Sequence, residues 1–83
     1  MTAAAETLVT HAWDLWEQEP EADHADLLRD AVWRLEEATD LGHDDVPKLA
    51  REVVYALTLC TGDERDEILA PMPGVASWLG FDR

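Results

Sequence analysis

Basic side chains are scarce in this chain of 83 residues, because six Lys and Arg stand against 19 Asp and Glu, for a formal net charge of −13. A surface with this charge repels nucleic acid and anionic membranes and attracts basic partners. A dense carboxylate surface also keeps a protein hydrated in molar salt, so salt adaptation is an alternative origin of the acidity. We therefore expect no direct binding to nucleic acid or to a membrane.

Cysteine and long apolar runs are also scarce. The single Cys60 excludes an internal disulfide, and its position in an apolar helical run predicts a buried side chain. No apolar run approaches the length that spans a membrane, and residues 1–6 lack the basic and apolar parts of a secretory signal. These shortages predict a cytoplasmic protein.

Apolar residues nevertheless make up 47% of the chain and include four Trp, which is too much for a disordered acidic tail. The length fits one domain, residues 1–83. Apolar residues recur at helical spacing, and no part of useful length alternates with the period of a strand. We predict an all-α fold, a small bundle of three to four helices with a short apolar C-terminal tail packed back on it.

Capping residues, glycine and proline predict where these helices begin and end. The first two span about residues 2–18 and 21–41, with Thr2 as a cap and Gly42 ending the second. Asp44 or Asp45 caps a third helix that Gly62 closes, and a short acidic helix covers about residues 64–70. Residues 75–81 are apolar enough to form a last helical turn that folds back on the bundle.

The acids concentrate in two runs that contain no Lys or Arg. The first comprises Asp14, Glu17, Glu19, Glu21, Asp23 and Asp26, and the second comprises Glu36, Glu37, Asp40, Asp44 and Asp45. The bases lie in or beside the predicted helices, at spacings that allow local ion pairs with Asp30, Glu37, Glu52 or Asp66. Two interpretations stay open: the runs form a solvated acidic rim, or they form a docking surface.

Trp33 is the most suggestive single residue. At 100° per residue it falls well off the apolar stripe of its helix, among Asp26, Asp30, Glu37 and Asp40. A large aromatic side chain on an acidic helical face is typical of a binding hot spot. Alternatively, Trp33 packs against the first helix, the C-terminal tail or Arg29, which lies one turn away.

Catalytic and metal-binding patterns are missing from the sequence. There is no Gly-rich phosphate loop, no nucleophile elbow and no pair of CxxC motifs. The nearest approach to a metal site is the run His43, Asp44 and Asp45, which loop polarity and helix capping explain. His24 is expected to be a partly buried packing residue. We expect the protein to have no enzymatic activity and to bind no cofactor and no metal ion.

These observations favour a non-catalytic acidic interaction module that binds a basic surface of a partner protein. In its sharper form the module is a nucleic-acid mimic that inhibits a nucleic-acid-binding protein. The residues expected to bind this partner are Asp23, Asp26, Asp30, Trp33, Glu37, Asp40, Asp44 and Asp45.

An alternative of a different class is a self-associating helical subunit of a larger assembly, such as a homodimer. Its acidity would then serve solubility or salt adaptation. The interface would be an apolar patch that the tail exposes if it does not fold back. The residues of this patch are Trp78, Leu79 and Phe81.

Overall fold

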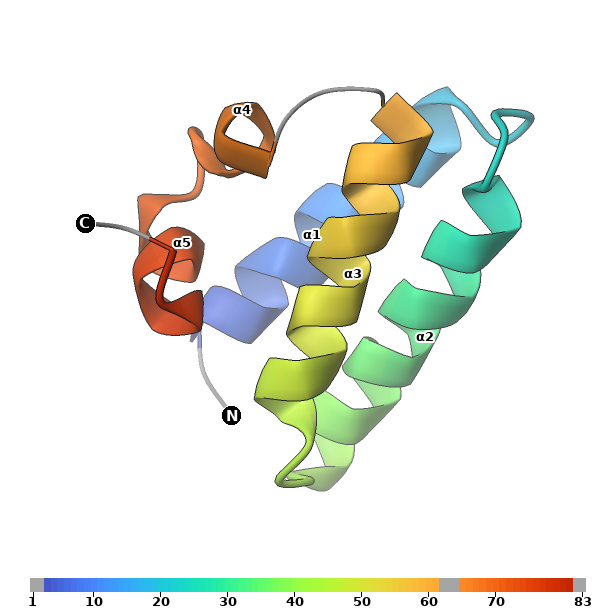
Figure 1. The fold of residues 1–83 in the computed structure, drawn as a ribbon. Helices are drawn as coiled ribbons and strands as arrows, with labels where there is room; N and C mark the ends of the chain where they lie inside the picture. The colour runs from blue at the N-terminus through green and yellow to red at the C-terminus, as the bar shows by residue number, and fades with distance from the viewer. Residues whose placement is uncertain (1–2, 62–64, 82–83) are drawn as a thin grey trace.

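The computed structural model describes residues 3–61 and 65–81 (Figure 1). The predicted cap Thr2 and the predicted stop Gly62 lie outside these ranges. The side chain of Cys60 is also outside the described part, so its burial stays a prediction.

Within the described ranges the chain forms three long helices and two short ones, and no strand. They are α1 (Ala3–Gln18), α2 (Ala25–Leu41), α3 (Val46–Thr61), α4 (Arg65–Leu69) and α5 (Pro73–Leu79). The all-α fold expected from the helical spacing of apolar residues is confirmed. None of the helices that the structure describes combines the length and the apolar character that crossing a bilayer requires.

Helices α2 and α3 lie side by side in opposite directions and form the centre of the core, with α1 crossing behind them (Figure 1). Leu28, Val32 and Leu35 recur every three or four residues along α2 and are almost completely buried. Val53 and Leu57 fill the corresponding positions on α3. The remaining helices add to the same apolar cluster, so one core holds all five together.

Gly42 ends α2 as predicted. Its backbone has a positive φ of 71°, which costs glycine little, and its N–H points at the carbonyls of Ala38 and Thr39. The N–H of His43 donates to the carbonyl of Ala38 over 3.0 Å. This tight corner turns the chain directly from α2 into α3.

The start of α2 was predicted wrongly, because the helix begins at Ala25 and not at Glu21. The preceding residues form turns, in which the N–H of Ala22 donates to the carbonyl of Glu19 over 3.2 Å. His24 then adopts a left-handed backbone with a φ of 68°, which interrupts a helix of L-residues. The prediction that His24 is partly buried was also wrong, since its side chain is exposed.

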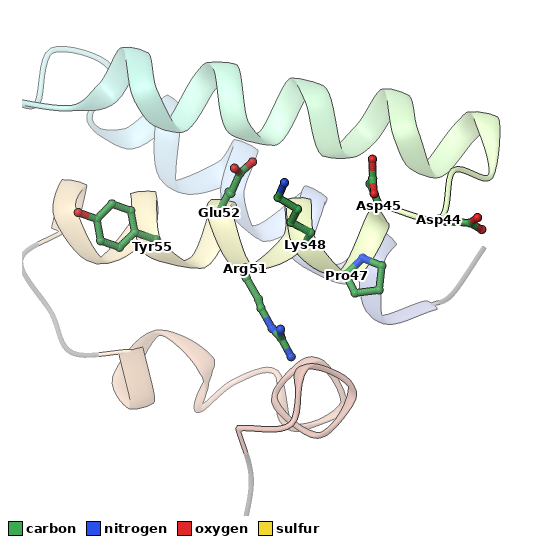
Figure 2. Close-up of a pocket in the computed structure, with 7 residues that line it drawn as sticks. All are labelled: Asp44, Asp45, Pro47, Lys48, Arg51, Glu52 and Tyr55. Atoms are coloured by element: carbon green, nitrogen blue, oxygen red, sulfur yellow. The ribbon is translucent and has the colours of Figure 1, made fainter.

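The C-terminal tail folds back on the bundle, as expected. Val75 and Leu79 of α5 are buried in the common core. A guanidinium nitrogen of Arg51, on α3, donates to the carbonyl of Leu79 over 3.2 Å, and Figure 2 shows this side chain extending toward the C-terminal helices. The guanidinium of Arg65 lies 4.4 Å from the ring centre of Phe81 and holds the last described residue against α4.

Core packing of α2 can be tested with Leu35→Ala, which removes a fully buried side chain. We expect the free energy of unfolding to fall by about 2–5 kcal/mol, since the substitution leaves a cavity between α2 and its neighbours. Urea denaturation followed by circular dichroism measures the change. Leu41→Ala is the control, because Leu41 is 66% exposed and its loss should cost less than about 0.5 kcal/mol. Equal unfolding midpoints for the two variants would contradict this core.

Candidate partner-binding surface

One face of α2 carries five of the eight residues that the sequence predicts to bind a partner. Burial of the apolar stripe against α1 and α3 turns the opposite face to solvent, and every residue on this face is exposed. Their spacing alternates between four and three residues, which keeps them in one row along about 21 Å of helix. We call this row the acidic face of α2, and its residues are Asp26, Asp30, Trp33, Glu37 and Asp40.

The N-terminal half of the acidic face is partly neutralised by a neighbouring base. The guanidinium of Arg29 lies 3.9 Å from a carboxylate oxygen of Asp26 and 3.6 Å from one of Asp30. All three side chains are more than half exposed, so each pair contributes little to stability. The pairs still reduce the negative charge that this half can offer to a partner.

The C-terminal half of the acidic face keeps its charge. Neither Glu37 nor Asp40 has an ion pair with any residue in the described ranges, although the spacing had allowed a pair between Glu37 and a nearby arginine. Arg34 instead pairs across the helix interface, with a guanidinium nitrogen 3.7 Å from Oε2 of Glu52 on α3. The last turn of α2 contains Asp40 and no basic residue. Because the C-terminal end of a helix is its negative end, these carboxylates interact unfavourably with the helix dipole and lower the stability of the fold.

Trp33 lies beside these unpaired carboxylates. Its side chain is 57% exposed, so packing against α1, the tail or Arg29, which the sequence left open, does not cover it. It lines a shallow hollow of about 340 Å³ together with Glu36, Glu37, Asp40 and Leu41. We call this the Trp33 hollow. Its lining contains three carboxylates, an aromatic ring, an exposed leucine and no Lys or Arg.

The negative surface continues from the Trp33 hollow toward α1. Glu36 and Asp40 also line a hollow of about 290 Å³ between α1 and α2, which we call the α1–α2 groove. Its other lining residues are Glu6, Val9, Thr10 and Thr39. The groove adds the carboxylate of Glu6 and again contains no basic residue. Sequence reasoning missed Glu6, because only the packing of α1 on α2 brings it close to these acids. It also missed Glu36 and Leu41, although their positions three and eight residues after Trp33 on one helix could have indicated them.

The other three predicted residues do not join the Trp33 hollow. Asp23 lies in the turn before α2, whereas Asp44 and Asp45 lie in the loop that leads into α3. The carbonyl of Asp45 accepts the N–H of Leu49 over 2.9 Å, which marks the first turn of α3. Both loop carboxylates therefore lie at the positive end of α3, where that helix stabilises them.

Asp44 and Asp45 line a separate hollow of about 530 Å³ whose charge is mixed (Figure 2). Lys48 and Glu52 point toward α2, whereas Arg51 points away toward α5. Tyr55 is 63% exposed at its other end. This hollow brings carboxylates and bases together, so its charge does not select a basic partner.

The residues of the alternative self-association patch lie against the core of the single chain. Leu79 is only 2% exposed, and Trp78 and Phe81 are partly buried against the same cluster. The exposed apolar patch that this alternative required is therefore not formed by the docked tail. Self-association through these residues would require the tail to leave the bundle.

His43, Asp44 and Asp45 occupy the exposed loop between α2 and α3. In the part of the chain that the structure describes, no three His, Cys, Asp or Glu side chains lie together in a way that could hold a metal ion. The carbonyl of Asp45 accepts the first hydrogen bond of α3, so Asp45 occupies the cap position that the sequence allowed.

Comparison of the chain with protein-family models, curated proteins and solved structures gives no match. The arguments for function therefore rest on the geometry and charge of the surface itself.

The charge mismatch at the end of α2 gives a stability prediction. The double variant Glu37→Gln, Asp40→Asn should raise the free energy of unfolding by about 0.3–1 kcal/mol, because it removes negative charge from the negative end of the helix. Asp26→Asn should change it in the opposite direction, since Asp26 lies in the first turn. Urea denaturation at low ionic strength measures both changes, and added salt should shrink them. A double variant less stable than the wild type would show that these carboxylates stabilise the fold.

Proposed function

We propose that this protein is a non-catalytic interaction module whose acidic α2 surface binds a basic surface of a partner protein, which it meets in the cytoplasm. The observation that carries the proposal is the Trp33 hollow, which unpaired carboxylates line together with an exposed indole. Aromatic side chains that stay exposed in the free protein are typical anchors of protein interfaces. Carboxylates around such an anchor select a partner with positive charge and increase the rate of encounter.

Two features favour a binding surface over an acidic rim that serves solubility alone. A rim for solubility gains nothing from an exposed tryptophan, since exposed apolar area promotes aggregation. It also gains nothing from placing carboxylates at the negative end of a helix, where they reduce stability. Both features occur within one hollow, and a basic partner would compensate for both by covering the indole and neutralising the carboxylates.

The sharper form of the proposal is mimicry of nucleic acid. Four carboxylates lie along about 21 Å of the acidic face, whereas one strand of B-DNA carries a phosphate about every 3.4 Å of its axis. The row is therefore sparser than a phosphate backbone. Mimicry would need the carboxylates of the α1–α2 groove as a second row beside the first, and Glu6 and Glu36 occupy that position.

The proposal is tested by affinity chromatography on the immobilised chain, with extract of its host cell applied at low and at moderate ionic strength. We expect mass spectrometry to identify a basic protein that is retained at low salt and released as salt rises. The double variant Glu37→Lys, Asp40→Lys should not retain this protein. If the mimic form is right, duplex DNA or RNA displaces the retained protein from the wild-type chain.

The matched control is Asp66→Lys, Glu67→Lys, which changes the net charge equally at two exposed residues of α4. Retention should survive in this control, because α4 does not contribute to the Trp33 hollow. Equal retention by both double variants would overturn the proposed surface. Equal loss in both would show that only the total charge matters.

A further inference from the structure

We infer that the Trp33 hollow binds an arginine side chain of the partner in preference to a lysine. The inference rests on the proposed function and specifies the chemistry of the partner at that site. It follows from the arrangement of one exposed aromatic ring and three carboxylates on consecutive turns of α2.

The side chain that enters this hollow must carry positive charge. Glu36, Glu37 and Asp40 lie on its rim, and no lining residue is basic. An apolar side chain placed over Trp33 would remove water from these carboxylates without replacing its hydrogen bonds, which is costly. A cation covers the indole and forms ion pairs with the carboxylates in place of their water.

The positions of the carboxylates favour a guanidinium over an ammonium. Glu36 and Glu37 follow Trp33 by three and four residues, so their side chains start about 5–6 Å from that of the tryptophan along the helix surface. A guanidinium is planar and can stack on the indole while its edge N–H groups donate to a carboxylate. An ammonium is a compact, strongly hydrated charge with no flat face to stack on the indole, so it gives up more hydration for a smaller contact.

The arginines that the structure describes are engaged elsewhere. Arg29, one turn before Trp33, pairs with Asp26 and Asp30, and Arg34 pairs with Glu52. Among the described residues the one cation–π contact is that of Arg65 on Phe81. The ring of Trp33 is therefore available to an arginine from outside.

The occupant is a short arginine-bearing segment of the partner, because the hollow does not end at Trp33. Glu36 and Asp40 belong both to the Trp33 hollow and to the α1–α2 groove, where Glu6 adds a further carboxylate. A second basic side chain a few residues from the first can therefore lie in the groove. The negative surface extends over both helices without a base among its lining residues, and this charge is complementary to such a segment.

The test is calorimetric titration of the full chain with an oligo-arginine peptide and with an oligo-lysine peptide of the same length. We expect the wild type to bind the arginine peptide about two- to fivefold more tightly, which corresponds to a cation–π contact at an exposed site. Trp33→Ala should remove this preference by weakening the arginine peptide alone. Circular dichroism checks folding, which should be intact because the residue is exposed.

Two controls separate this inference from the proposed function. Tyr55→Ala removes an aromatic ring of similar exposure from α3 and should leave the preference unchanged. Asp66→Asn, Glu67→Gln should weaken both peptides less than Glu37→Gln, Asp40→Asn does. Equal affinity of the wild type for the two peptides, or a preference that survives Trp33→Ala, would overturn the arginine site alone. Failure to bind either peptide, or equal weakening by both double variants, would overturn the acidic α2 surface as well.

Discussion

The packing of α2 against α3 determines where the charges of this molecule lie. Leu28, Val32 and Leu35 must face α3 and α1, because burial of their side chains is a main source of stability in so small a domain. Once that stripe is buried, the periodicity of the helix leaves Trp33 and its neighbouring carboxylates on the opposite side. The proposed binding surface is thus a consequence of the core, and a rotation of α2 about its axis would turn this face toward the interior.

Charge is also divided unequally within the molecule. Residues 19–45 contain ten Asp and Glu and two arginines, whereas α3 carries Lys48, Arg51 and a single Glu52. Within the acidic part, Arg29 partly compensates Asp26 and Asp30 in the first half of α2, whereas Glu37 and Asp40 in the second half pair with no base among the described residues. A basic partner would therefore meet a surface whose potential is strongest near Glu37 and Asp40, and not a uniformly negative protein.

The fold could be predicted from the sequence wherever periodicity or backbone chemistry is local. The apolar stripe of α2 and the glycine cap at Gly42 are consequences of residues close together in the chain, whereas the docking of the tail could be expected from its apolar composition. The start of α2 could not be predicted in this way. Glu21 and Asp23 suit the start of a helix, but turn hydrogen bonds and the left-handed backbone of His24 delay the first helical turn to Ala25. The exposure of Trp33 followed from its angle on the helix. The link from this surface to Glu6 on α1 could not be predicted, because it depends on tertiary packing that the periodicity of one helix does not contain.

The tight corner at Gly42 has a further consequence for how the chain distributes its acids. It brings the C-terminal end of α2 next to the N-terminal end of α3, so helix ends with opposite partial charges meet within a few residues. The positive end of α3 stabilises the carboxylates of Asp44 and Asp45, which follow the corner. The negative end of α2 destabilises the carboxylate of Asp40, which precedes it. Carboxylates only four residues apart therefore differ: those after the corner are stabilised by the backbone of their own chain, whereas Asp40 before it has no cation beside it among the described residues.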